Sequence, residues 1–397
     1  MSAGALRALS PDGRLLLLTR FTRLFAYGAL SVVLVLYLTA LGFDTQRIGV
    51  LLTLTLAGDT AISLWLTTRA DRIGRRRILI LGAALMTAAG LTFALSSNFL
   101  VLAIVGAIGV ISPTGNEVGP FLPVEQAALA HVVPSARRTS VFAWYTLTGA
   151  FATALGSLGA GVLSQALHSR GVVILYAALG LVLVFSFTRL SPDTEVMAQP
   201  TTAVFGLGLS RTVVLRLAAL FALDSFAGGF VVQSFAAYWF YLRFGVHPAT
   251  LGAIFFGANL LAGISALVAS RLAARFGLLR TMVFTHLPSN VLLILVPLMP
   301  SLPLAVAVLF ARFSISQMDV PTRQSYLMAV VGPEERSAAG GTTGVARTIG
   351  AGLAPLFAGL LFARPSLINV PFFIAGALKI VYDLLLYRAF AGSPRYA

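Results

Sequence analysis

The sequence predicts an all-α membrane protein, with twelve transmembrane helices in two pseudo-symmetric six-helix bundles. Of its 397 residues, 58% are hydrophobic and only 10% are charged, whereas a soluble globular domain is about half apolar and about a quarter charged. The length leaves roughly 33 residues for each of twelve helices, enough for about 20 residues in the bilayer and a short loop. No separate soluble domain fits beside them.

An internal repeat divides the chain into two related halves. With a fixed offset of 198 residues, the sequence Pro-Val-Glu-Gln at 123–126 aligns with Pro-Thr-Arg-Gln at 321–324, and the match continues without a gap over about 40 residues. Two parallel halves are a common layout of membrane transporters, with the substrate site between the halves near mid-membrane. We therefore predict a first bundle, an inner linker and a second bundle at residues 1–189, 190–211 and 212–397.

In the first half, the first span follows Arg20 and Arg23 and is closed by the turn at Gly42, and a basic stretch at 70–77 separates the second span from the third. The fourth span is long and contains several prolines, which a membrane tolerates only where protein or water satisfies the freed backbone carbonyls. The fifth span is rich in Gly and Ala, which allows close helix contact.

The second half repeats this order after the linker. Aromatic residues around Trp239 place one end of the seventh span at a membrane interface. Arginines at 271, 275 and 280 separate the eighth span from the ninth, and the tenth span mirrors the fourth. The twelve spans are expected at residues 21–41, 48–68, 78–96, 99–131, 139–163, 171–189, 213–241, 250–270, 281–299, 303–331, 339–362 and 367–387.

The positive charges are unevenly distributed along the chain. If the N-terminus is cytoplasmic, 20 of the 28 lysines and arginines fall on cytoplasmic segments, as positive loops in membrane proteins do. The net charge of +15 then reflects topology and contact with anionic lipid, and we expect the lipid bilayer but no nucleic acid as a partner. We expect a multi-pass protein of the plasma membrane (a bacterial inner membrane), monomeric, with both termini cytoplasmic.

Several kinds of site are excluded by composition. Cysteine is absent, so disulfides and thiolate metal sites are excluded, and four scattered histidines make a transition-metal site unexpected. No phosphate-binding Gly-x-x-x-x-Gly-Lys-Ser/Thr loop occurs, so ATP is not the expected energy source, and no cofactor is expected. Residues 1–14 lack the apolar core and cleavage site of a signal peptide.

The chain resembles the major facilitator superfamily over essentially its whole length. The family motif between the second and third spans reads Gly-x-Leu-Ala-Asp-Arg-x-Gly-Arg-Arg; residues 67–77 keep its Asp-Arg-x-Gly-Arg-Arg end but have Thr67 and Arg69 in place of the leading Gly and Leu. The resemblance implies a transporter that works by alternating access. It also implies that Asp71, Arg72 and Arg75 lock the outward-open state through contacts between cytoplasmic helix ends.

Ionisable residues inside the spans are the candidate functional groups. Asp59 and Asp224 lie near mid-depth in the second and seventh spans, and Glu117 lies in the proline-rich fourth span. An ionised side chain at this depth is expensive and normally faces a partner or a wet cavity, and burial disfavours the charged form of a carboxyl group. These three acids are our candidates for proton coupling; the alternative is that they hold helices together by hydrogen bonds.

Other charged residues predict a gate and a cavity. In the family that the chain resembles, the fourth and eleventh spans approach one another when the inner side closes, so Glu125 and Arg347 are expected to form an inner gate pair. Asp319 and Arg323 share one helix face and either line the cavity or pair within their helix. The candidate cavity residues are Tyr27, Asn116, Glu117, Tyr145, Gln233, Asn259, Asp319 and Arg323.

The twelfth and ninth spans are usually peripheral in the family, so their polar residues are interpreted structurally. Lys379 and Asp383 are four residues apart, and we expect an ion pair within the twelfth span. His286 and Asn290 in the ninth span are expected to be packing groups.

These observations predict a secondary active transporter of a small organic solute, and they favour proton-coupled export by antiport because the basic motif resembles that of bacterial exporters. The alternative is a carrier of an anionic or zwitterionic metabolite, because Arg312, Arg323 and Arg347 crowd the tenth and eleventh spans. A membrane receptor or lipid scramblase of the same fold is a further alternative and would need no proton-titrating acid. An enzyme is not expected, since no nucleophile–base or metal-ligand spacing occurs.

Overall fold

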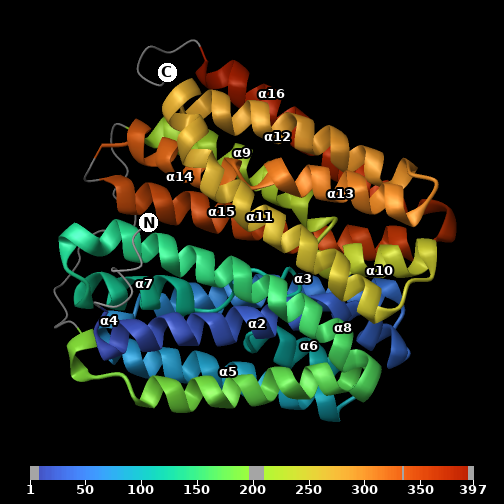
Figure 1. Ribbon diagram of the computed structural model, residues 1–397, viewed down its shortest axis with the longest axis horizontal. Coiled ribbons are helices and arrows are strands. Elements are labelled where there is room, and N and C mark those ends of the chain that lie inside the picture. The colour runs from blue at the N-terminus through green and yellow to red at the C-terminus, as the bar shows by residue number, and fades with distance from the viewer. Residues whose placement is uncertain (1–8, 196–209, 333–334, 392–397) are drawn as a thin grey trace. The chain divides into compact units, whose positions relative to one another are not determined.

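The twelve predicted spans are all present in the computed structural model, which describes residues 9–195, 210–332 and 335–391 (Figure 1), without the side chains of residues 71, 135–137, 139, 140 and 337. Ten stretches of this part are helical, long and apolar enough to cross a membrane. One of them holds two spans because its backbone leaves the helical conformation at His168 (φ 59°), and a shorter apolar helix begins the fourth span. The all-α prediction is thereby confirmed.

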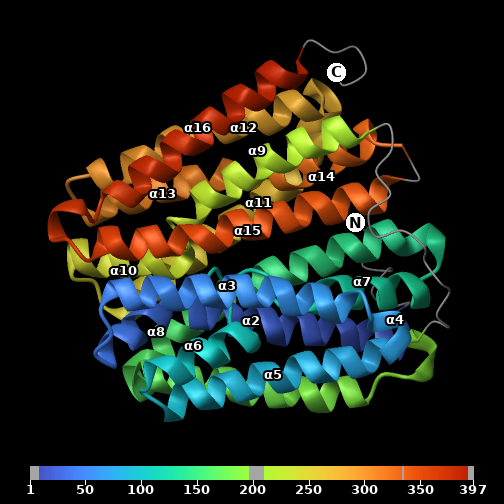
Figure 2. The same ribbon diagram turned by 180° about the vertical axis from the view of Figure 1, so that it is seen from behind.

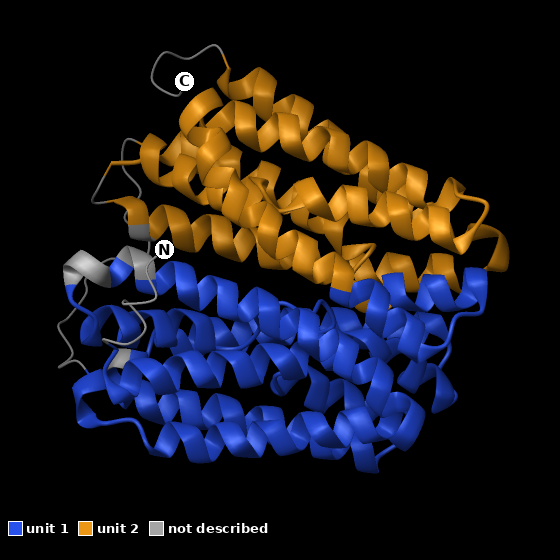
Figure 3. Ribbon diagram, in the orientation of Figure 1, with its two compact units in different colours: residues 1–199, 236–256 blue, residues 200–235, 257–397 orange. Residues whose placement is uncertain are grey.

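The chain forms two compact units (Figure 3). Unit 1 comprises residues 1–199 and 236–256, and unit 2 comprises residues 200–235 and 257–397. Residues 236–256, which the sequence-based division assigns to the second half, belong to unit 1 by their contacts.

Within unit 1, α2 packs along α8, α5 also packs on α8, and α3 packs on α6. The helices of its first 199 residues are α2 (Pro11–Ala40), α3 (Thr45–Thr67), α4 (Ala70–Ile73), α5 (Arg75–Leu95), α6 (Phe99–Ile108), α7 (Phe121–Val132) and α8 (Ser135–Thr188), followed by a 3-10 turn (Pro192–Thr194).

Helix α2 begins ten residues before the predicted start of the first span. The side chain of Ser10 accepts a hydrogen bond from the backbone N–H of Gly13, Pro11 occupies the first turn, and Asp12 follows it. A capping hydroxyl, a proline without a donor and an acid near the positive helix end all favour a helix start. The consequence is that Arg20 and Arg23 lie inside the helix and are buried, rather than at its end.

The second half of the chain contains the other spans. Helix α9 packs on α15 and α16, and α12 packs on α13, α14 and α16 (Figure 2). The helices are α9 (Arg211–Gly229), α10 (Gln233–Phe244), α11 (Pro248–Phe276), α12 (Leu278–Leu295), α13 (Leu302–Ser316), α14 (Asp319–Val330), α15 (Arg336–Phe362) and α16 (Val370–Phe390).

Glycines allow close helix packing in both units. A Cβ atom on Gly156 of α8 would overlap the carbonyl oxygen of Phe25 in α2, and a Cβ atom on Gly350 of α15 would overlap the carbonyl oxygen of Ala222 in α9. Small residues at such crossings let backbones approach closely, which is how helices associate in a membrane. Close packing thus occurs between the first and fifth spans of unit 1 and between the seventh and eleventh spans of unit 2.

The variant Gly350→Ala is expected to be destabilised by about 1–3 kcal/mol, because the new methyl group forces α15 away from α9. Gly344→Ala on the same helix is the matched control: a Cβ atom there has nothing within 4 Å, and the loss of glycine flexibility alone is neutral or stabilising by up to about 1 kcal/mol. Thermal unfolding in detergent measures both, and equal midpoints for the two variants would contradict the close packing.

Candidate functional site

The fourth span is interrupted between α6 and α7, and side chains from three other helices bind its irregular backbone. Tyr176 donates to the carbonyl of Val110 (2.6 Å), Tyr27 donates to the carbonyl of Val118 (3.3 Å), and the carboxylate of Asp59 accepts from the N–H of Gly119 (2.7 Å). Non-helical backbone at membrane depth is tolerated only where protein or water satisfies it. The segment 109–120 is thus held in place by the surrounding helices.

Glu117 lies on this interrupted segment and takes part in a buried cluster of charges. Its carboxylate pairs with Arg20 and, at 3.3 Å, with Arg23, both from α2. The Arg23 guanidinium also binds Glu125 of α7 with two hydrogen bonds, of 2.6 Å and 2.9 Å. The hydroxyl of Tyr145 of α8 donates a hydrogen bond to Glu125. The guanidinium of Arg20 stacks on the Tyr145 ring, with its Cζ atom 4.0 Å from the ring centroid. We call these five residues the unit 1 cluster.

The unit 1 cluster contains two guanidinium groups and two carboxylates, so its formal charges balance. The side chains of Arg23 and Glu125 are 0% exposed, whereas Glu117 is 16% exposed. Glu117 is therefore the more accessible of the two carboxylates of the cluster.

A second buried cluster lies in unit 2 around Asp224 of α9. Arg323 of α14 binds one carboxylate oxygen of Asp224 at 2.8 Å, and Lys379 of α16 binds the other at 2.5 Å. Arg323 also pairs with Asp319, four residues before it, at 3.4 Å. We call these four residues the unit 2 cluster; here too, two cations face two carboxylates.

The two clusters contain equivalent ion pairs with opposite polarity. Glu125 is the fifth residue of the 12-residue helix α7, and Arg323 is the fifth residue of the 12-residue helix α14. Their partners Arg23 and Asp224 occupy similar positions along α2 and α9. A buried ion pair at a similar place thus joins the first and fourth spans of unit 1 and the seventh and tenth spans of unit 2.

The remaining predicted cavity residues are distributed over both units. The Asn116 side chain is exposed on the interrupted segment, and Tyr27 is fully buried. In unit 2, Asn259 donates to the side-chain oxygen of Gln233 at 3.2 Å. The interactions neither test nor assign a role in substrate binding, so these residues remain predictions.

Of the two residues predicted to form the inner gate, Glu125 is bound by side chains of its own unit, whereas Arg347 has no ion pair among the described residues. Glu125 is bound by Arg23, Tyr145 and, at 3.0 Å, by Thr19. The Arg347 side chain is exposed, and in the described part of unit 2 it makes no ion pair within 4 Å. A Glu125–Arg347 gate therefore remains a prediction, and it requires Glu125 to leave or share its present partners.

In the basic motif at residues 67–77, the start of helix α5 is capped by a carboxylate. The carboxylate of Glu195 accepts hydrogen bonds from the backbone N–H groups of Arg75 (2.7 Å) and Arg76 (3.0 Å) at the first turn of α5. Arg72 is exposed, while Arg75 is buried and donates to the carbonyl of Thr194 at 3.4 Å. The side chain of Asp71 lies outside the described residues.

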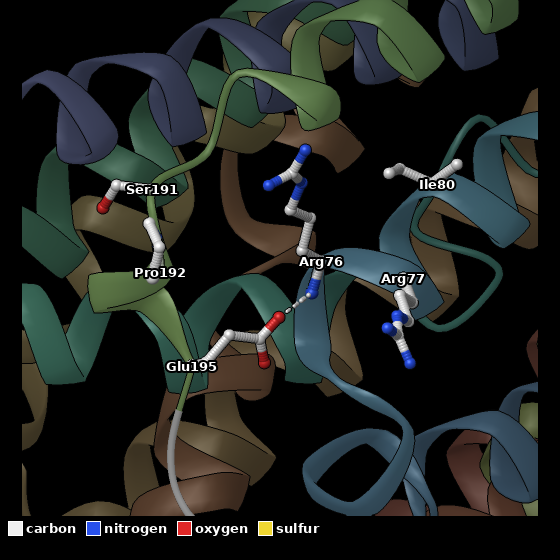
Figure 4. A pocket seen from close by; sticks show the side chains of 6 residues that line it. All are labelled: Arg76, Arg77, Ile80, Ser191, Pro192 and Glu195. Carbon is white, nitrogen blue, oxygen red and sulfur yellow. Dashed lines mark hydrogen bonds between the residues drawn. The ribbon is translucent and has the colours of Figure 1, made fainter.

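A pocket of about 410 Å³ opens beside this capped helix start (Figure 4). Its lining contains none of the residues of the two clusters, so it is separate from the candidate transport site. The lining residues are Arg76, Arg77, Ile80, Ser191, Pro192 and Glu195.

The expected ion pair between Lys379 and Asp383 is wrong. Lys379 binds Asp224 of α9, and Asp383 is hydrogen bonded to His286 and Asn290 of α12. The four-residue spacing shows only that two side chains share a helix face, and here stronger partners on neighbouring helices lie at that face. His286 and Asn290 are accordingly members of a polar network and more than packing groups.

Sequence reasoning missed the partners of the buried acids. Arg20 and Arg23 looked like charges that end a span, although the Ser-Pro-Asp start signal at residues 10–12 could have placed them inside the helix. Glu195 lies within the predicted linker at residues 190–211 and carried no recognisable signal. Among the described residues, no group of three His, Asp or Glu side chains is arranged to hold a metal ion.

Comparisons with known proteins agree with this architecture. The family model described as Major Facilitator Superfamily matches residues 16–243 and 217–396. An uncharacterised membrane protein of Saccharomyces cerevisiae, YJR124C, is 31% identical over 428 aligned residues, which cover 97% of this chain and 95% of that protein.

Solved structures of three transporters have a similar fold. A bacterial homologue of the human lysosomal transporter Spinster has a TM-score of 0.77 at 15% identity, with 96% of this chain and 98% of that chain covered. The nucleoside transporter NupG has a TM-score of 0.72 at 16% identity, with 97% and 100% covered. A D-xylose–proton symporter has a TM-score of 0.72 at 13% identity, with 95% and 97% covered.

A double-mutant cycle should reveal the buried ion pair of the unit 1 cluster. Replacing only one partner, in Arg23→Met or Glu125→Met, is expected to cost about 3–5 kcal/mol, because an unpaired charge remains buried. The double variant is expected to recover most of this loss, as apolar side chains of similar volume replace a buried pair well. Thermal unfolding of the purified protein measures the cycle, and strictly additive losses would show that the pair is not coupled.

Removing the carboxylate of Glu195 should weaken the start of α5. Glu195→Ala is expected to cost about 0.5–2 kcal/mol, the usual value of a helix cap, and Glu195→Gln less, because its amide oxygen still accepts hydrogen bonds. Asp193→Ala in the same 3-10 turn is the control, as that side chain is exposed. The rate of protease cleavage where α4 meets α5 reports local opening of the helix start. Equal cleavage rates for all three variants would argue against the cap.

Proposed function

The chain belongs to the major facilitator superfamily, and we propose that it exports a small organic solute in exchange for protons. It is a transporter that moves a solute across the membrane by alternating access. The direction of transport and the proton coupling are our proposal, and they rest on the acids of unit 1.

The observation that carries the proposal is the place of Glu117. It lies on the interrupted segment of the fourth span, is partly exposed, and pairs with Arg20 and Arg23. A proton on Glu117 would leave two guanidinium groups against the single charge of Glu125, so the cluster must then rearrange. A proton and a polar solute that both need this carboxylate exclude one another, and mutual exclusion at one site is what antiport requires.

Asp59 provides a second group that can respond to protons. It binds the N–H of Gly119 and the hydroxyl of Ser63, at 2.7 Å and 3.3 Å, and has no basic partner among the described residues. A protonated carboxyl oxygen is a poorer acceptor for the Gly119 N–H, so protonation of Asp59 would loosen the interrupted segment beside Glu117. Asp224 is the weaker candidate for proton binding, because ion pairs with Arg323 and Lys379 already stabilise its ionised form.

Arg347 favours a second candidate function, a carrier of an anionic or zwitterionic solute. Its side chain is exposed and has no ion pair among the described residues, whereas Arg20, Arg23 and Arg323 are each matched by carboxylates. An accessible guanidinium group without a carboxylate partner is well suited to bind a carboxylate or phosphate of a solute.

Transport by the full chain in proteoliposomes tests the proposal, after a panel of compounds has been screened for thermal stabilisation of the purified protein. A pH gradient is imposed so that the compartment that receives the solute is the more acidic one. Protons then flow in the direction opposite to the solute, and the wild type is expected to accumulate the solute on the acidic side. Glu117→Gln and Asp59→Asn should reduce this effect by about 5- to 150-fold, the usual strength of coupling between two sites.

Asp44→Asn is the matched control for these variants, since Asp44 is an exposed acid that caps α3, and asparagine caps a helix equally well. Transport by the wild type that ignores the imposed gradient would contradict proton coupling. Movement of lipid that survives neutralisation of Glu117, Asp59 and Asp224 together would favour a scramblase instead.

A further inference from the structure

A buried polar network in unit 2 connects Asp224 of α9 with His286 and Asn290 of α12 and with Asp383 of α16. The Nδ1 atom of His286 lies 2.9 Å from Oδ1 of Asp383, and Nδ2 of Asn290 donates to Oδ2 of Asp383 at 2.9 Å. On the other side of the ring, Nε2 of His286 lies 3.8 Å from Oδ1 of Asp224. The imidazole is therefore placed between two carboxylates.

The contacts of the ring nitrogens limit where protons can lie on this pair. A neutral imidazole has one N–H donor and one acceptor nitrogen, whereas an ionised carboxylate is only an acceptor. Nδ1 of His286 also lies 3.2 Å from Nδ2 of Asn290. If Asp383 were ionised and His286 neutral, either Nδ1 would present its lone pair to Asp383 at 2.9 Å, or Nδ1 would donate there and Nε2 would turn its lone pair toward the negative charge of Asp224, 3.8 Å away. One additional proton removes this conflict, whether it makes His286 an imidazolium or makes Asp383 a carboxylic acid.

The charge balance leads to the same result. Asp383 is 0% exposed, and among the described residues its one basic neighbour within 4 Å is His286. Lys379, on the same helix, is bound to Asp224 instead. A buried carboxylate without a cation is costly, so the His286–Asp383 pair is neutral only when it holds the additional proton.

We propose that the His286–Asp383 pair is a proton-binding site of unit 2, whose occupancy is linked to the pairing of Asp224. When the pair holds the additional proton, either as an imidazolium or as a carboxylic acid on Asp383, the Nε2–H group of His286 points toward Asp224. The carboxylate of Asp224 therefore attracts the additional proton more strongly whenever Lys379 or Arg323 leaves this carboxylate. The proposal rests on the proposed proton coupling. It identifies a site for the coupling proton other than Glu117, Asp59 and Asp224.

The charged and titratable groups around the pair come from every helix that packs on α12 and from the helices next to these. Arg312 of α13 lies in the field of Asp319 and Asp224, and Arg347 of α15 is repelled by Arg323. The ring of Tyr382 meets the His286 ring edge-on at 5.9 Å between centroids. These groups are Asp224 on α9, Arg312 on α13, Asp319 and Arg323 on α14, Arg347 on α15, and Lys379 and Tyr382 on α16.

Spectroscopy of the purified full chain tests the site with the proton itself as the probe. With ¹⁵N-labelled histidine, four side chains contribute signals, and His286→Gln assigns the relevant one. At neutral pH we expect either an imidazolium signal from His286 or an infrared carbonyl band of a protonated carboxylic acid, and Asp383→Asn should abolish whichever is present. A neutral His286 together with no acid band that depends on Asp383 would overturn the proposal.

Two variants keep this test decisive. His247→Gln removes an exposed histidine and should leave the His286 signal unchanged. If Asp383→Asn does not fold, Asp383→Glu replaces it, because the longer acid shifts the band without removing it. A band that does not shift in Asp383→Glu, with His286 neutral, again overturns the site.

Transport then connects the site with coupling and separates the two failures. In proteoliposomes with the solute found by the stabilisation screen, His286→Gln and Asp383→Asn are expected to lose the dependence of transport on an imposed pH gradient, while Asp44→Asn keeps it. If the wild type itself shows no such dependence, the proposed antiport fails. If the wild type shows it and both variants keep it within about twofold, below the weakest usual coupling, only the His286–Asp383 site fails.

Discussion

Each unit of this transporter is organised around a buried ion pair that joins two of its spans. In unit 1 the pair is Arg23–Glu125, and in unit 2 it is Asp224–Arg323. An apolar pair of the same size would hold these helices at least as well, since the desolvation of two charges offsets most of their attraction. Stability alone therefore gives no reason for charges at these positions, whereas a protein that must respond to protons or to a polar solute requires them.

The interrupted fourth span follows from the same constraint. A carboxylate that binds two arginines of α2 must approach them closely, and Glu117 does so from a segment that is free of helical geometry. The cost is a set of backbone groups without helical partners, which the side chains of Tyr27, Asp59 and Tyr176 satisfy. The hydroxyl and carboxylate groups around this segment are thus part of the structure that positions Glu117, whatever else they do.

Much of the fold is predictable from the sequence, because it depends on properties of single segments. Apolar length determines which segments cross the membrane, and the repeat at 123–126 and 321–324 identifies the equivalent spans. The pairing of charges is a property of helix rotation and helix neighbours, which the sequence does not state. Lys379 illustrates this: its spacing to Asp383 allows an intrahelical pair, but the rotation of α16 directs it to Asp224.

The early start of α2 at Pro11 was missed for a different reason. The residues Ser10, Pro11 and Asp12 predict a helix start by themselves, yet the apolar run that marks the span begins only after Arg20. A helix in a membrane protein can extend beyond its apolar run wherever another helix buries its charges. Arg20 and Arg23 therefore show that a charged residue next to an apolar run has to be judged by its possible partners on other helices before it is assigned to a loop.

The inverted polarity of the two ion pairs distinguishes the units chemically. In unit 1 the acids lie on the interrupted fourth span and the arginines on the first; in unit 2 the tenth span carries the arginine and the seventh the acid. Both clusters are neutral when counted over their direct contacts, so either can stay buried without carrying net charge into the low-dielectric interior. The His286–Asp383 pair adds to unit 2 a group that is neutral with one proton and negative without it. Loss of that proton would place a second negative charge near that of Asp224, and a change of ion pairing or of exposure to water in unit 2 would relieve this repulsion.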